Sequence, residues 1–123
     1  MHMRAERSGT AEVRSKIWLE RDGEVVLSEW RVALLAAIAA EGSLTRAADR
    51  LGVPYRTAWE RVRETERAVG VALVESASGG ADGGGTRLTE AGASVVDRWN
   101  RAAGGVREEI EARFRAEFAD LLD

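Results

Sequence analysis

Two short helical patterns on either side of the turn Gly52-Val53-Pro54 constrain this chain more than any other feature. Apolar residues recur at helical spacing in both, at Leu44, Ala47, Ala48 and Leu51 before the turn and at Ala58, Val62 and Val69 after it. Gly52 ends the first helix, and Pro54, whose φ is fixed near the helical value, opens the second. Two short helices joined by such a turn predict a helix-turn-helix. The alternative is a pair of small helices that only pack around a turn.

Two β-hairpins are predicted on either side of these helices. Asp22-Gly23 is a strong turn signal between the β-rich runs at residues 16–20 and 24–28, with the start of a helix as the alternative there. The runs VALVES and TRLT flank the stretch ASGGADGGG, which predicts a flexible hairpin tip because glycine has many backbone conformations to lose. A hairpin after the second helix makes a helix-turn-helix winged. The glycines of this wing are Gly79, Gly80, Gly83, Gly84 and Gly85.

Capping residues define the other helices. Ser28 predicts the cap of a helix over residues 29–41, and Ser43 that of the helix over 44–51. Thr89 predicts the start of one long final helix, 90–122, which Gly104-Gly105 weakens or bends. The expected fold class is mainly α with small β-hairpins, a winged helix-turn-helix with a long C-terminal dimerisation helix. The expected domains are a disordered N-terminus (1–13), the winged helix-turn-helix (14–100) and the C-terminal part of the dimerisation helix (101–123).

Charge is unevenly distributed along the chain. The net charge of −3 is unusual for a protein that binds nucleic acid. Residues 1–107 hold 16 Lys and Arg against 15 Asp and Glu, a balance of +1, while residues 108–123 hold 2 against 6, a balance of −4. The acidity is therefore concentrated in the tail. Local patches, not the charge of the whole chain, decide where a phosphate backbone can dock.

Composition also argues against several classes of function. The chain has no cysteine and a single histidine, His2, so we expect no disulfide, metal site, cofactor or enzymatic activity. No apolar run approaches the roughly 20 residues that span a bilayer. Residues 1–10 lack the apolar segment of a signal peptide. A cytoplasmic protein without a membrane partner is the expectation.

Polar side chains of the second helix lie off its apolar stripe, where they would face a DNA groove. Arg56 is the best candidate for reading a base, because a guanidinium can donate two hydrogen bonds to guanine. Tyr55 and Thr57 are suited to phosphates or to a thymine methyl group. Glu60 is suited to accept a hydrogen bond from cytosine. Double-stranded DNA is therefore the predicted partner.

Phosphate contacts are expected from flanking elements. Thr45 and Arg46 begin the first helix of the pair, and Arg87 lies in the wing. The second helix carries four Arg and three Glu between residues 55 and 67, however, and such patterns are often only a solvated, ion-paired face. The rival interpretation is a protein-interaction module on a winged-helix scaffold that has lost DNA binding.

Large apolar residues suggest a core and a second interface. For Trp59 we expect a place in the core, with packing between helix and wing as the alternative. The stripe of the final helix is too long for a small domain to cover alone, which predicts a homodimer with two heads about 34 Å apart on DNA. The residues of this predicted dimer interface are Trp99, Val106, Ile110, Phe114, Phe118 and Leu121.

The stretches GSLTRAADRLGVPYRTAWERVRETE and LVESASGGADGGGTRLTEAG resemble the DNA-binding head of the molybdate-responsive regulator (ModE) family. The first is also similar, more loosely, to LysR-type regulators, and the resemblance covers about residues 28–100. It implies a bacterial, dimeric, sequence-specific DNA-binding transcription regulator. By position, Thr45 and Arg46 would contact the DNA backbone, and the wing over 79–87 would lie on the flanking backbone. Tyr55, Arg56, Thr57 and Arg61 would meet the groove.

Three features depart from that family. Its members continue into a molybdate-binding domain, which we expect this chain to lack, so that the resemblance identifies no small-molecule effector. Ser76 stands where a basic residue is common, and Asp82 adds a negative charge to the wing tip. Pro54 replaces a capping serine and removes one cap oxygen. The second of these departures weakens the expected phosphate contacts of the wing.

Overall fold

The computed structural model describes residues 9–77 and 85–122 of the 123-residue chain. The chain divides into two compact units. We call residues Ile17–Ala102 the head, and the described parts of Met1–Lys16 and Ala103–Asp123 the terminal unit. Each unit is considered by itself.

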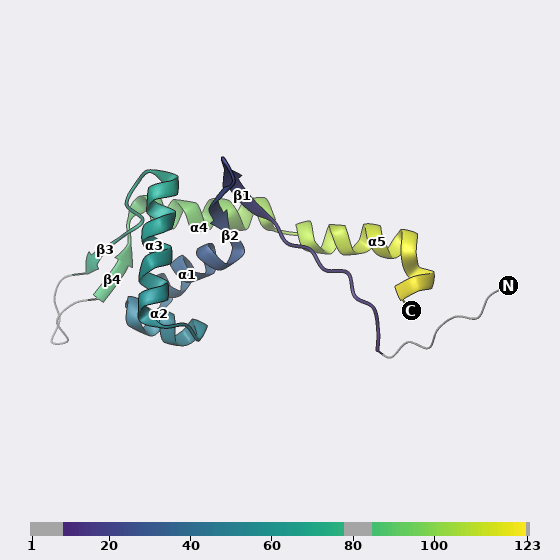
Figure 1. Ribbon diagram of the computed structural model, residues 1–123, viewed down its shortest axis with the longest axis horizontal. Coiled ribbons are helices and arrows are strands. Elements are labelled where there is room, and N and C mark those ends of the chain that lie inside the picture. Colours follow the sequence, from purple (N-terminus) through teal and green to yellow (C-terminus); the bar gives the residue numbers. More distant parts are fainter. Residues whose placement is uncertain (1–8, 78–84, 123) are drawn as a thin grey trace. The chain divides into compact units, whose positions relative to one another are not determined.

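The head contains two hairpins and four helices, and the terminal unit contains one further helix (Figure 1). In chain order the elements are β1 (Trp18–Arg21), β2 (Glu24–Ser28), α1 (Glu29–Glu41), α2 (Leu44–Leu51), α3 (Tyr55–Val69), β3 (Val74–Ala77), β4 (Gly85–Leu88), α4 (Glu90–Ala103) and α5 (Val106–Leu122). β1 pairs with β2 and β3 with β4, both antiparallel. The expected class, mainly helical with small hairpins in a winged helix-turn-helix arrangement, is confirmed.

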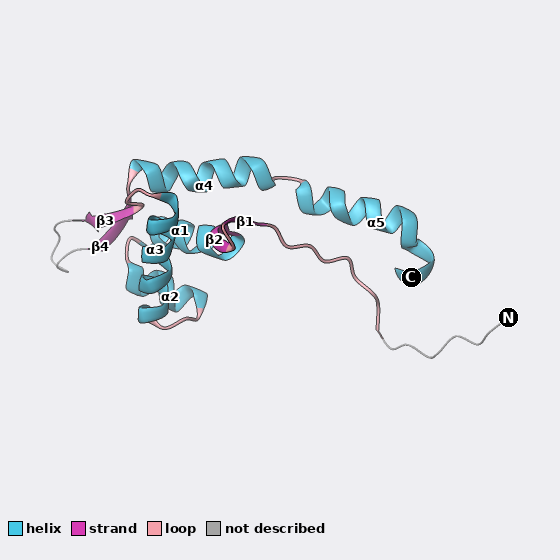
Figure 2. Cartoon of the chain, turned by 45° about the horizontal axis from the view of Figure 1, so that its top comes forward, coloured by secondary structure: helices cyan, strands magenta, loops and turns pink. Residues whose placement is uncertain are grey.

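The predicted caps explain where the helices of the head begin and end. Ser28 Oγ accepts a hydrogen bond from the backbone N–H of Arg31, and Ser43 Oγ accepts one from that of Arg46, each at 3.2 Å. Gly42 ends α1 with a φ of 70°, a left-handed conformation that favours glycine. The chain is thereby turned sharply between α1 and α2, and again between α2 and α3 (Figure 2).

Two groups of buried apolar residues hold the head together. In the first, α1, α2 and α3 meet around Ile38, Ala47 and Ala58, which are completely buried. The small alanine side chains let these helices approach closely. In the second, Val32 and Leu35 of α1 pack with Leu73 and with Val95 of α4. The head therefore closes a core of its own.

The structure refines two expectations about the helices. The final helix predicted over 90–122 is interrupted at the glycines that were expected to weaken or bend it, because α4 ends at Ala103 and α5 begins at Val106. Gly105, between them, has a φ of 81°, which no helix continues. Pro54 does not form the first helical residue of α3. It has a φ of −61° but an extended ψ of 146°, so it is the N-cap, and as expected it supplies no side-chain cap bond.

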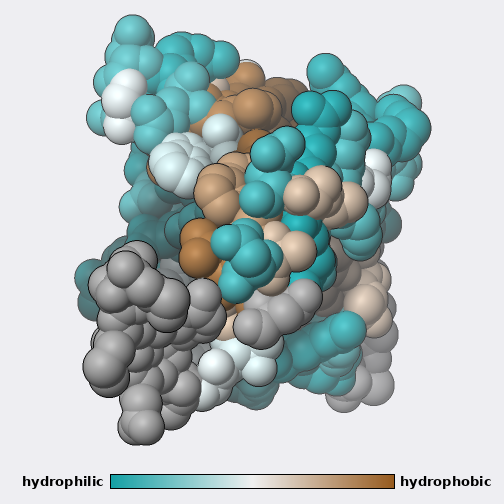
Figure 3. All heavy atoms as spheres, turned by 90° about the vertical axis from the view of Figure 1, so that its right-hand side faces the viewer, coloured by the Kyte–Doolittle hydropathy of each residue, from teal (hydrophilic) through white to brown (hydrophobic). Residues whose placement is uncertain are grey.

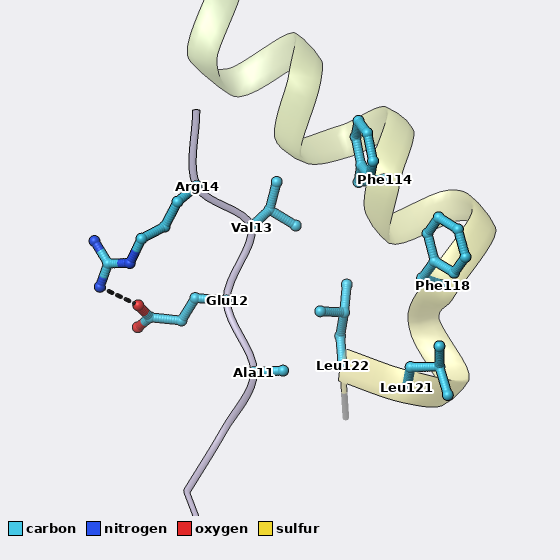
Figure 4. Close-up of a pocket in the computed structure, with 8 residues that line it drawn as sticks. All are labelled: Ala11, Glu12, Val13, Arg14, Phe114, Phe118, Leu121 and Leu122. Carbon is cyan, nitrogen blue, oxygen red and sulfur yellow. Dashed lines mark hydrogen bonds and ion pairs between the residues drawn. The ribbon is translucent and has the colours of Figure 1, made fainter. Parts of the chain in front are cut away.

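The terminal unit pairs α5 with an extended segment near the N-terminus. Ala11 and Val13 face Phe114, Phe118 and Leu122 of α5 across a hollow of about 340 Å³ (Figure 4). Glu12 and Arg14 point the other way and form an ion pair at 2.6 Å, as alternation along an extended chain requires. Of the segment predicted to be disordered, residues 1–8 lie outside the described residues. No helix within the described ranges is long and apolar enough to cross a membrane.

Candidate nucleic-acid interface

The exposed face of α3 is more basic than its sequence indicates. Of the four Arg and three Glu between residues 55 and 67, three Arg and one Glu are exposed, which leaves a balance of +2 on the solvent side. Glu64 is half-buried, and Glu66 is buried. The exposed residues of the helix are Tyr55, Arg56, Trp59, Glu60, Arg63 and Arg67. Full or partial burial of two acidic side chains against one basic side chain raises the balance from +1 over the whole helix to +2 on its exposed side.

Arg56, the predicted base reader, extends into solvent. Its side chain is 88% exposed, and its Nε donates a hydrogen bond to Oε1 of Glu60 at 3.1 Å, one helical turn away. Exposed ion pairs of this kind contribute about 0–1 kcal/mol. Arg56 can therefore exchange Glu60 for another acceptor with little loss. Glu60, the predicted cytosine contact, lies on the same exposed face as Arg56 and Tyr55.

Two other predicted groove residues lie at the edge of this face. Thr57 and Arg61 are half-buried. Arg61 Nη1 donates to both carboxylate oxygens of Glu64, at 3.1 and 3.2 Å, and Glu64 also accepts from Arg31 at 3.2 Å. Arg61 is therefore more firmly held than Arg56, and the structure brings it less directly to the exposed face.

Thr45 and Arg46 are exposed at the start of α2, as a phosphate contact requires. Nη2 of Arg46 donates to the backbone carbonyl of Glu41 at 3.1 Å, which folds the side chain back over the end of α1. Arg50, one turn further along α2, pairs with the carboxylate of Glu41 at 3.2 Å. α2 thus presents two exposed cations, Arg46 near its start and Arg50 near its end, whose internal bonds are weak and exposed.

The wing is joined directly to the turn that precedes α2. The backbone N–H of Thr86 donates to the carbonyl of Gly42 at 3.0 Å, and a Cβ at Gly85 would collide with that same carbonyl oxygen. Arg87 pairs across the hairpin with its register partner Glu75 at 3.0 Å. Gly79, Gly80, Gly83 and Gly84 of the predicted wing, with Asp82, lie outside the described residues. Ser76 is exposed on β3.

Glu66 is a residue whose role the sequence did not reveal. One of its buried carboxylate oxygens accepts hydrogen bonds from the backbone N–H groups of Leu73 at 2.8 Å and Val74 at 3.3 Å. The other accepts from Nη1 of Arg63 at 2.7 Å. Glu66 therefore fixes where the wing begins relative to α3. The only signal in the sequence is an Arg three residues earlier, which every ion-paired helix surface shares.

Trp59 corrects a further expectation. We predicted it in the core, but 43% of the residue is exposed on α3. The guanidinium of Arg63, one turn away, lies over its ring at 5.3 Å from the ring centre, which is a cation–π contact. The hydrophobic periodicity gave the wrong prediction for Trp59, because an aromatic residue beside a buried stripe can lie on either side of the boundary between core and surface.

The side chains of α2 and α3 define what this surface can bind. Within residues 9–77 and 85–122, no three His, Cys, Asp or Glu side chains gather so that they could hold a metal ion. The exposed groups of α2 and α3 are hydrogen-bond donors, aromatic rings and two carboxylates, those of Asp49 and Glu60. These groups are suited to binding a polyanion that also presents hydrogen-bond donors and acceptors in a fixed pattern.

A helix pair of this kind with a β-hairpin behind it defines the winged helix-turn-helix class. Residues 31–93 match the family described as bacterial regulatory helix-turn-helix protein, lysR family. The chain belongs to this family of DNA-binding transcription regulators. The predicted resemblance is thus confirmed at the level of the family.

Relatives and solved structures agree with this assignment. The molybdenum-pterin-binding protein MopB of Rhodobacter capsulatus is 40% identical over 94 residues, 76% of this chain and 34% of MopB. The DNA-binding transcriptional dual regulator ModE of Escherichia coli (strain K12) is 36% identical over 73 residues, 59% of this chain and 28% of ModE. The chain thus spans about a third of the length of these relatives. The fold also matches the CbnR DNA-binding domain in its DNA complex, with a TM-score of 0.57, 24% identity, and coverage of 74% of this chain and 98% of that one.

Proposed function

We propose that the protein is a sequence-specific transcription regulator that binds double-stranded DNA as a homodimer, with α3 in the major groove. The observation that carries this proposal is the exposed face of α3, where three Arg accompany one Glu beside two exposed aromatic rings. A duplex offers phosphates to such a face from the groove walls and base edges from its floor. Two similar proteins, the DNA-binding transcriptional dual regulator ModE and the CbnR DNA-binding domain in its DNA complex, support the same proposal.

Roles within the interface follow from exposure and from internal bonding. Arg56, freely extended, reads guanine, while Tyr55 and Glu60 contact neighbouring base edges. Thr57 and Arg61 contact the wall of the groove from the edge of the helix. Thr45 and Arg46 at the start of α2, and Arg87 on the wing, bind phosphates.

Dimerisation is assigned to the terminal unit. α5 has no buried residue within this chain, and Phe114, Phe118 and Leu121 are each about half exposed. Val106 and Ile110 continue the same stripe, half-buried, while Trp99 of α4 packs against the second core group of the head. A second copy would remove the exposed stripe from water and hold two heads at successive major grooves, about 34 Å apart. The protein would act where DNA is found, in the bacterial cytoplasm.

The proposal is tested by fluorescence anisotropy with labelled DNA tiles from the gene's own upstream region. Unlabelled scrambled duplex at roughly 0.15 M salt serves as competitor, because phosphate contacts depend strongly on salt. One tile bound far more tightly than its scrambled counterpart supports a sequence-specific regulator. Equally weak binding of every tile contradicts it and favours the protein-interaction module, whose surface would be the exposed stripe of α5.

Two substitutions distinguish base recognition from phosphate binding. We expect Arg56→Ala to reduce discrimination between the bound tile and single-base variants by about 1–3 kcal/mol at one position. Arg46→Ala should weaken all duplexes alike and lower the slope of log affinity against log salt by about 1. Equal losses on specific and scrambled DNA in both variants would contradict this division of roles.

A further inference from the structure

An exposed aromatic edge runs along α3. Tyr55 and Trp59, one turn apart, are 52% and 43% exposed. Residues four apart lie on the same side of a helix, so these two rings form one apolar strip beside the arginines. The strip lies on the face that carries a balance of +2, which is where a polyanion would bind.

The indole of Trp59 is held by two successive contacts. Arg63 lies over one face of the ring at 5.3 Å, and Nη1 of the same Arg63 donates to the buried carboxylate of Glu66 at 2.7 Å. Glu66 is itself fixed by the backbone N–H groups at the start of the wing. A ring held in this way loses little conformational freedom on binding, which favours a specific contact.

The chemistry of the surroundings limits what the ring can meet. Tyr and Trp are enriched at interfaces because each combines an apolar body with a polar tip, so two such rings exposed on one side of a helix indicate a contact surface. The neighbours of these rings are cations, so that the partner must be anionic overall and yet offer an apolar group at this point. In the major groove of DNA the C5-methyl group of thymine meets that requirement, and no other base edge there carries a methyl group.

We infer that Trp59 determines specificity by packing its ring against the C5-methyl group of a thymine in the bound site, with Arg63 and Glu66 as positioning residues. The inference rests on the proposed function and adds to it the base that the strip recognises. Tyr55, on the same strip, extends the apolar surface toward the start of α3.

The test replaces thymine by deoxyuridine throughout the bound DNA tile, since uracil differs from thymine only by lacking that methyl group. The wild-type protein should bind the deoxyuridine tile about fourfold more weakly for each contacted methyl group, the effect of one methyl-sized group moved out of water. In Trp59→Ala the ratio of the two affinities should fall by about fourfold, the contribution of the methyl group that Trp59 contacts. Trp59→Phe, which keeps an apolar ring, should retain part of the ratio.

Arg67→Gln is the matched control, because Arg67 is exposed on the same helix and its loss removes charge without removing apolar surface. It should weaken both tiles equally and leave their ratio unchanged. An unchanged ratio in Trp59→Ala, or a wild-type protein that binds both tiles equally, would overturn the inference while leaving the proposed function standing. A protein that binds neither tile would overturn both. If Trp59→Ala unfolds, the Trp59→Phe ratio decides.

Discussion

The head and the terminal unit handle apolar side chains in opposite ways. Among the described residues of the head, twelve apolar residues are buried, and they come from α1, α2, α3, α4 and the segment around Leu73. In the terminal unit, α5 has no buried residue, and its two phenylalanines stack on each other at 6.1 Å while remaining 51% and 45% exposed. The space-filling view likewise shows apolar surface exposed among hydrophilic side chains (Figure 3). Apolar side chains therefore have different outcomes in the two units: in the head they form a core, and in the terminal unit they remain exposed on α5, where we propose that a second copy binds.

The largest effect on the free energy of unfolding should come from truncating a side chain in the core of the head. Ile38→Ala removes a completely buried side chain and should lower the free energy of unfolding by about 2–5 kcal/mol. Phe114→Ala removes a larger side chain from α5 but should change the unfolding of the head by no more than about 0.5 kcal/mol. Urea unfolding followed by circular dichroism measures both. Similar losses in the two variants would remove the distinction between the two units.

A somewhat smaller effect is expected on association. The double substitution Phe114→Asp with Phe118→Asp places charge on the exposed stripe and should weaken the dimer about a hundredfold, without altering the melting temperature of the head. Sedimentation velocity over a series of concentrations measures the dissociation constant. Ala112→Asp with Ala116→Asp is the control, since these exposed residues lie on the opposite side of α5 and add the same charge. A wild-type monomer, or equal weakening by both pairs, would show that the stripe is not the interface.

The smallest predicted effect concerns the contact between α3 and the base of the wing, within the head. Glu66→Gln should cost about 1–3 kcal/mol, because the amide cannot accept all three hydrogen bonds that the carboxylate receives. Hydrogen exchange at the amides of Leu73 and Val74 should become faster, which would make the base of the wing locally less stable. Glu90→Gln, at an exposed carboxylate of α4, is the control. Unchanged exchange in Glu66→Gln would show that Glu66 does not hold the wing.

Local chemistry made much of the head predictable. Ser28 and Ser43 cap helices by short-range hydrogen bonds, and the turn at Asp22-Gly23 needs only its own two residues, with Asp22 at a φ of 53°. The apolar spacing of Ala47, Ala48 and Ala58 likewise identified the face on which the helices pack. Wherever a few neighbouring residues decide the outcome, the sequence was a sufficient guide.

The candidate interface depends on contacts between residues that are distant in the sequence, and local sequence patterns do not predict such contacts. The burial of Glu66 is decided by where the segment around Leu73 returns against α3, which periodicity within α3 cannot show. The break at Gly104-Gly105 was anticipated as a bend, but its extent required the left-handed conformation of Gly105. The balance of +2 on the exposed face of α3 could not be predicted, because the sequence does not show that Glu66 is buried and Glu64 half-buried.

The close approach of Gly85 to the carbonyl of Gly42 has a consequence for how this protein tolerates mutation. Gly85 has no side chain and contributes no charge, yet any added carbon would push the wing away from the turn that carries α2. In a library of random variants selected for DNA binding, position 85 should therefore accept as few substitutions as a position in the core. Exposed cations such as Arg87, which we propose to bind phosphates, should exchange for lysine with comparatively little loss. A close contact between two backbone segments can therefore restrict substitution as strongly as a role in binding does.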